Sequence, residues 1–157
     1  MPHERFRFKS LEELRAKADA LGLTLPADVD LSPLARRVRI GSKWTPNALG
    51  IHPMEGCDGT AGGKPDALTI RRYLRFARGG AGLLWFEATA VVPEGRANPR
   101  QLLLIPENAA DFAALRENSL AAGRDANGAD YDPFPVLQLA HSGRYCRPVD
   151  KPAPMIA

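Results

Sequence analysis

The chain has 157 residues, of which 45% are hydrophobic and 25% charged, which suits one globular domain and excludes wholesale disorder. Its 21 basic and 18 acidic residues give a net charge of +3. The arginines at 71, 72, 75 and 78 have helical spacing without an aromatic platform on which bases could stack. We therefore interpret these arginines as a solvated helix face rather than a nucleic-acid surface. No apolar run approaches the ~20 residues of a membrane span, and two distant cysteines without a signal-peptide pattern favour a reducing cytoplasm.

The first predicted element is an amphipathic helix over residues 11–21. Ser10 and Glu13 have the spacing of a capping box, in which each side chain satisfies a free backbone amide at the start of a helix. Apolar residues recur at helical intervals up to Leu21, and the following Gly22 is typical of a C-terminal stop.

A proline-punctuated stretch comes next, and it contains one strand-like pattern. The alternating residues 37–40 stand directly before Gly41 and Ser42, which predicts a strand followed by a turn. We therefore expect residues 1–46 to form an N-terminal extension, made of a helix and a hairpin, that precedes the main fold.

Beyond residue 46 the apolar residues gather in short runs with helical segments between them. Buried apolar strands that alternate with helices pair in parallel through right-handed crossovers, so this pattern predicts an α/β fold. Polar or unusual residues follow each run, at the edge where parallel sheets bind ligands. In chain order we expect a strand at 48–51, a helix at 66–77, a strand at 83–86, a helix at 109–122 that stops at Gly123, and a strand at 136–139.

Three motifs at the ends of these strands occur in a characteristic order. They are His52-Pro53-Met54, then Phe86-Glu87-Ala88-Thr89 with Pro93-Glu94-Gly95-Arg96, then Gln138-Leu139-Ala140-His141-Ser142-Gly143-Arg144. In order and spacing they resemble the old yellow enzyme family. The resemblance implies an FMN-bearing (β/α)8 TIM barrel whose flavin takes hydride from NADH or NADPH and reduces activated alkenes or similar acceptors. A complete barrel needs about 250 residues, so residues 47–157 would supply about its first three βα units.

The resemblance also implies which residues hold the cofactor. The segment 52–55 corresponds to a stretch whose backbone runs beside the flavin ring, and Ala88 to a small residue that leaves room for it. The amide of Gln138 can both donate to and accept from the pyrimidine edge of the ring. Many members carry a cysteine or threonine where this chain has Glu55. The implied cofactor-binding residues are His52, Pro53, Met54, Glu55, Ala88 and Gln138, and Cys57 lies near a substrate-contacting position.

Other interpretations compete for some of these residues. Glu87 is a general base by residue type, but we favour a buried carboxylate bonded to a neighbouring loop. The glycine-rich loop 56–63 lacks the ending of a P-loop, which favours a plain strand-to-helix connection. We assign no catalytic residue, because the family's paired substrate-binding residues would lie beyond residue 157. We also predict no metal site, since no usual zinc spacing is formed by His52, Cys57, His141 and Cys146.

Two functions of different classes are consistent with these observations. The first is an FMN-dependent oxidoreductase that acts on a small-molecule substrate. The second is a catalytically inactive fragment, or one half of a split barrel that needs a C-terminal partner, because a three-stranded sheet leaves an open edge that a partner or a homo-oligomer must cover. Neither function predicts a nucleic-acid or membrane partner.

Overall fold

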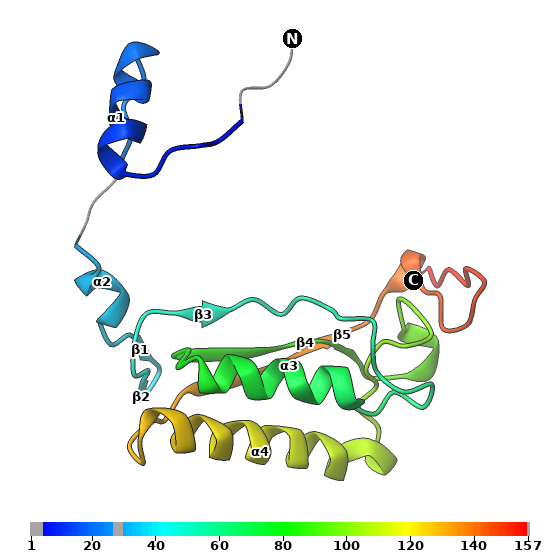
Figure 1. Cartoon of the computed structure of the whole chain (residues 1–157). Helices are drawn as coiled ribbons and strands as arrows, with labels where there is room; N and C mark the ends of the chain where they lie inside the picture. Colours follow the sequence, from blue (N-terminus) through cyan, green and yellow to red (C-terminus); the bar gives the residue numbers. More distant parts are fainter. Residues whose placement is uncertain (1–4, 27–29, 157) are drawn as a thin grey trace. The chain divides into compact units, whose positions relative to one another are not determined.

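The computed structural model describes residues 5–26 and 30–156, which form two units, one up to Ser32 and one from Pro33. The first unit contains α1 (Leu11–Ala20), and the second contains a hairpin, a parallel sheet and two long helices (Figure 1). The hairpin that we expected in the N-terminal extension therefore belongs to the unit of the sheet.

Helix α1 starts and stops where its sequence predicts. The Ser10 hydroxyl accepts a hydrogen bond from the Glu13 amide at 3.2 Å, and the Glu13 carboxylate accepts one from the Lys9 amide at 2.8 Å. Gly22 has a φ of 66°, a value that glycine adopts without steric cost. With this backbone turn, the amides of Gly22 and Leu23 bond back to carbonyls of the last helical turn, which closes the helix.

The predicted strand and turn are also confirmed. After the short helix α2 (Ser32–Ala35), β1 (Arg39–Ile40) pairs antiparallel with β2 (Lys43–Trp44) around a two-residue turn. Gly41 takes a φ of 61° in that turn, as hairpin turns require. The buried side chain of Thr45 closes the hairpin, because its hydroxyl accepts from the Val38 amide at 3.0 Å.

The main sheet has three parallel strands in the order β3-β4-β5. These strands span Gly50–Ile51, Leu83–Ala90 and Phe134–Ala140, so β4 and β5 are longer than predicted and β3 is shorter. The parallel pairing agrees with the prediction from alternating strands and helices. The register between β4 and β5 shifts between Phe86 and Thr89, so the ladder is irregular just where the second motif lies.

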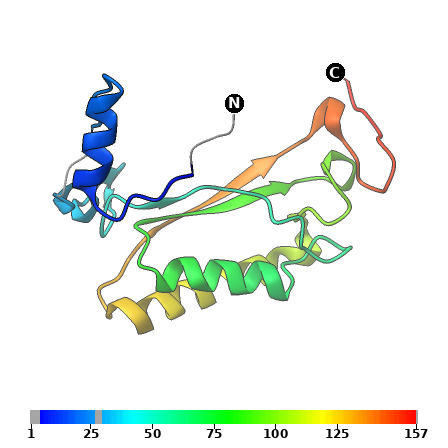
Figure 2. The same cartoon turned by 45° about the horizontal axis from the view of Figure 1, so that its top comes forward.

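Both long helices cover the same face of this sheet (Figures 1 and 2). Helix α3 (Ala67–Arg78) connects β3 to β4, and α4 (Ala109–Asn127) connects β4 to β5. Trp85 of β4 is 37% exposed and lies on the opposite face of the sheet. Val136 of β5 is paired with Trp85 and so shares this face. Because side chains alternate along a strand, Gln138, two residues further on, lies on the same face. The helix-side core consists of Tyr73, Ala77, Ala81, Leu84, Phe86, Leu115 and Leu120.

Helix α4 does not stop at Gly123 as predicted but continues to Asn127. A Cβ atom on Gly123 would lie 2.3 Å from a ring carbon of Tyr131. The glycine therefore lets the Tyr131 ring pack against the helix backbone and does not end the helix. Gly128, with a φ of 100°, follows the true end. Short 3-10 helices lie at Pro93–Gly95, Pro106–Asn108 and Gly143–Tyr145. Within the described ranges, no helix has the length and apolar character needed to cross a membrane.

Candidate functional site

The C-terminal half of β4 carries a buried carboxylate, that of Glu87. This residue is 1% exposed, and its carboxylate accepts from the Gly56 amide at 3.3 Å, the Tyr73 hydroxyl at 3.1 Å and Arg72 at 2.6 Å. The Tyr73 hydroxyl in turn accepts from the Glu87 amide at 2.6 Å. A buried charge is tolerated when it is paired and hydrogen-bonded. The structure thus favours the structural interpretation of Glu87 over the catalytic one.

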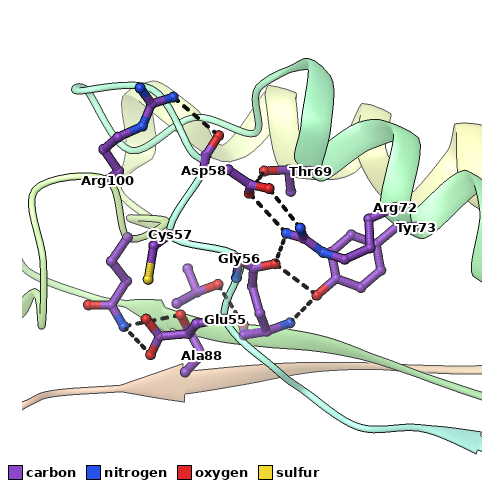
Figure 3. Close-up of polar contacts among 12 residues, drawn as sticks. Glu55, Gly56, Cys57, Asp58, Thr69, Arg72, Tyr73, Ala88 and Arg100 are labelled. Carbon is purple, nitrogen blue, oxygen red and sulfur yellow. Dashed lines mark hydrogen bonds and ion pairs between the residues drawn. The ribbon is translucent and has the colours of Figure 1, made fainter.

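Arg72 joins this carboxylate to the loop after β3. Its guanidinium donates to both carboxylate oxygens of Asp58, at 2.7 and 2.9 Å, as well as to Glu87 (Figure 3). The Thr69 hydroxyl adds a third hydrogen bond to Asp58, at 2.7 Å. The bonds from Arg72 hold the pKa of the Asp58 carboxyl below its usual value, against the opposing effect of burial. Arg72 is therefore part of a partly buried ion-pair network, which corrects its assignment to a solvated helix face.

A second polar cluster lies around the buried side chain of Gln101. Its amide nitrogen donates to the Glu55 carboxylate and to the Ala88 carbonyl, both at 3.1 Å, while its oxygen accepts from the Ala97 amide at 2.6 Å. Asn98 donates to the other Glu55 oxygen at 3.3 Å. Burial, and next the charge of Glu87, raise the pKa of the Glu55 carboxyl. Gln101 thereby links two of the residues that the sequence assigned to the cofactor.

Cys57 is exposed beside this cluster and has a φ of 50°, which is uncommon for a residue with a side chain. The Asn98 amide nitrogen lies 3.3 Å from its sulfur. Burial is the largest cause that raises the pKa of the Cys57 thiol, and the charges of Glu55 and Glu87 act in the same direction. A raised pKa disfavours the thiolate, the form in which a cysteine acts as a nucleophile.

Arg96 connects the loops that follow β3 and β4. Its guanidinium donates to the carbonyls of Ala61 at 2.9 Å and Gln101 at 2.7 Å, and to that of Pro99. The Arg147 amide donates to the Arg96 carbonyl at 2.8 Å, which attaches the segment after β5 to the same point. Burial lowers the pKa of the Arg96 guanidinium. One buried arginine therefore ties together the loops of all three strands.

The structure places the remaining predicted residues at the same edge of the sheet. His52 and Met54 are exposed just after β3, and the Met54 amide bonds to the His52 carbonyl at 2.8 Å, with Pro53 half-buried between them. Gln138 is half-buried in β5. Its side-chain amide has no hydrogen-bond partner among residues 5–26 and 30–156, so no such bond connects it to the Gln101 cluster.

His141 makes a contact within its own loop and packs against the loop after β4. Its Nδ1 accepts from the Gly143 amide at 3.1 Å, and a Cβ atom on Gly95 would lie 2.7 Å from its ring. In the part of the chain that the structure describes, no group of three histidine, cysteine, aspartate or glutamate side chains is placed to hold a metal ion.

Sequence reasoning missed Arg72, Asp58 and Gln101. Arg72 has the same helical spacing as the exposed arginines of α3. It directly precedes the buried Tyr73, however, and is half-buried itself, so it lies at the side of the helix face that carries the other arginines. Gln101 and Glu55 are 46 residues apart in the sequence, and no local sequence pattern predicts the hydrogen bond between them. Gln101 could only be found by placing the loop after β4 next to the loop after β3.

Comparisons with known proteins agree with this arrangement. An NADPH dehydrogenase of Bacillus pumilus (strain SAFR-032) is 36% identical over 83 residues, which cover 52% of this chain and 22% of that enzyme. A solved 2-naphthoyl-CoA reductase has a TM-score of 0.65 at 18% identity and matches 74% of this chain and 17% of its own. The old yellow enzyme homologue from Zymomonas mobilis has a TM-score of 0.58 at 22% identity, over 71% of this chain and 28% of its own.

No protein-family model matches the chain. The chain spans about a fifth of the length of the curated relative, 22%, and likewise matches only a part of each solved structure. The sequence match and the shared fold nevertheless point to the same group of proteins that the three strand-end motifs indicated. The chain is thus similar to part of the proteins of the old yellow enzyme family, and the resemblance seen in its sequence is confirmed.

Proposed function

We propose that this chain forms the first three βα units of a (β/α)8 barrel that works as an FMN-dependent NAD(P)H oxidoreductase and reduces activated alkenes or similar acceptors. The observation that carries the proposal is the convergence of the three motifs at one edge of a parallel sheet. In TIM barrels this edge forms the active site. The similarity to an NADPH dehydrogenase supports a nicotinamide as the reductant.

The residues at this edge fit a flavin. Gln138 is half-buried, and its side-chain amide has no hydrogen-bond partner in the described residues, so it is available to a polar ligand. Ala88 is buried and small, and the backbone of segment 52–55 is accessible at the end of β3. His52, Pro53, Met54, Glu55, Ala88 and Gln138 would hold the ring, with Cys57 beside the substrate. Bound FMN would supply the hydride transfer, while these groups orient the ring.

A flavin-binding measurement tests the proposal directly. We expect the purified chain to perturb the absorption bands of added FMN, and NADPH under anaerobic conditions to bleach them. Gln138→Ala should weaken FMN binding about tenfold, as expected for the loss of one well-placed hydrogen bond. Asn118→Ala, on the exposed face of α4, is the matched control and should bind like the wild type. Equal FMN affinity of Gln138→Ala and the wild type would refute this role for Gln138.

A second candidate function is that of a half barrel without activity of its own, which a C-terminal partner segment would complete. A specific observation favours it: among residues 5–26 and 30–156, β5 pairs only with β4, and a groove of about 310 Å³ lies between β5 and α4. A further βα unit would cover both features, and self-association into a homo-oligomer would cover them in its absence. The groove is lined mainly by Phe86, Leu104, Phe112, Leu115, Val136 and Leu137. Absence of any FMN binding by the chain alone would favour this candidate.

The proposed compartment is the cytoplasm. Both cysteines are free, with Cys57 exposed and Cys146 buried, which suits a reducing environment. Detection of either thiol as a disulfide in protein purified from cells would contradict this proposal.

A further inference from the structure

Arg72 is held in place by two carboxylates, those of Asp58 and Glu87. Two bonds to Asp58 and one to Glu87, all between 2.6 and 2.9 Å, use both terminal nitrogens of its guanidinium. The Asp58 and Glu87 side chains are 14% and 2% exposed, so water cannot readily replace these bonds. The planar head of Arg72 consequently has one defined position below the loop after β3.

The backbone at Gly56 lies directly against this fixed head. A Cβ atom on Gly56 would lie 2.3 Å from both terminal nitrogens of Arg72 and 2.6 Å from its central carbon. A long side chain can usually move away from such a contact, but Arg72 is held by two carboxylates. The Gly56 amide also donates to Glu87, so the same network that excludes a side chain at residue 56 bonds its backbone.

This contact has consequences for the preceding residues. The segment 52–55 leads directly from β3 into Gly56, and Glu55 is held on its other side by Gln101 and Asn98. The path of the backbone across the strand ends is thus set at two points, the Gln101 cluster at Glu55 and the Arg72 network at Gly56 and Asp58 (Figure 3).

We propose that Arg72 is a positioning residue of the strand-end site: through its bonds to Asp58 and Glu87 it supports the backbone at Gly56 and so fixes the course of segment 52–55. The support of the loop by Arg72 does not depend on the proposed function, but the role of segment 52–55 as a flavin contact does. Arg72 itself lies beneath the loop and acts through it, not on the ring.

A double-mutant cycle between Gly56 and Arg72 tests the inference. Gly56→Ala should raise the hydrogen-exchange rate of segment 52–58 in the flavin-free chain about tenfold, while the amides of β4 keep their protection. Arg72→Lys keeps the charge but lacks the planar fork. Arg72→Lys should therefore loosen the loop by itself, and adding Gly56→Ala to Arg72→Lys should change the rate little. Equal effects of Gly56→Ala in both backgrounds would overturn the proposal.

Gly62→Ala is the matched control in the same glycine-rich loop, because its Cβ would meet only the Thr60 hydroxyl, at 3.9 Å. This variant should leave both loop exchange and FMN binding unchanged. FMN affinity of all variants gives a second readout. Wild-type protein that binds no FMN contradicts the proposed function, while the exchange cycle still decides the role of Arg72. Weaker FMN binding that follows the loop exchange across the cycle supports positioning, and unchanged FMN binding despite a loosened loop overturns it.

Discussion

At the scale of single residues, charge and burial oppose each other most clearly at Asp58. Its carboxyl loses hydration in a partly buried position, but two bonds from Arg72 and one from Thr69 outweigh that loss, and the net effect is a lowered pKa. A carboxyl whose pKa is lower in the folded than in the unfolded state stabilises the fold above its unfolded pKa. This contribution is lost as the pH falls through the folded value.

The Asp58→Asn variant turns this into a prediction about pH. At pH 7 we expect the variant to unfold at a lower urea concentration than the wild type. Its free energy of unfolding should be lower by about 1–2 kcal/mol, a small loss because the ion pair is partly open to water. Between about pH 4 and pH 2 the wild type should lose that advantage, since the unfolded carboxyl titrates near 3.9. Asp130→Asn, at an exposed site, should show no such difference. Parallel stability curves for Asp58→Asn and the wild type across this range would count against the ion pair.

At the scale of elements, α4 shows how packing can override a local signal. Glycine is a frequent helix stop, and Gly123 stands where an apolar helical pattern weakens. Its function instead is to admit the ring of Tyr131, whose hydroxyl donates to the Ala81 carbonyl at 2.7 Å at the start of β4. Asn127 extends the same connection with bonds to the carbonyls of Ala77 and Arg78 on α3.

We therefore expect Gly123→Ala to destabilise the chain by about 1–3 kcal/mol through overpacking, even though alanine is the better helix former by about 1 kcal/mol. The reason is that Tyr131 cannot move away without losing its bond to Ala81. In a Tyr131→Ala background the space is open, and Gly123→Ala should become neutral or stabilising. Urea unfolding of the four proteins measures the coupling, and a destabilisation that persists without the tyrosine ring would contradict this account.

Element order was predictable from the sequence because it depends on local patterns. Short apolar runs and the helical segments between them suffice to place β4, β5 and the two long helices within a few residues. The bounds differ where tertiary contacts decide them, as in the extension of α4 past Gly123. The site was predictable only at the strand ends. Its supporting contacts, such as Gln101 with Glu55, join residues that are distant in the sequence.

At the scale of the whole molecule, the parallel sheet has its helices on one face, and no strand of the described part of the chain pairs with the outer edge of β5. Trp85 is 37% exposed and Leu139 58% exposed, and the groove between β5 and α4 adds further apolar surface. Exposed apolar surface favours association. The half-barrel candidate and the oxidoreductase candidate share this requirement, because either must cover the edge with a further βα unit or with another copy.

A charge at the groove tests whether this surface drives association of the chain. Ala113 is exposed on α4 and lines the groove, whereas its neighbour Ala114 is exposed but does not line it. Ala113→Lys should shift the chain toward the monomer in sedimentation velocity at increasing protein concentration, because a lysine there would lose hydration on contact with an apolar partner. Ala114→Lys adds the same charge and should associate like the wild type. If Ala114→Lys lowers association as much as Ala113→Lys does, net charge and not the groove controls assembly, and the β5 edge is covered by another route.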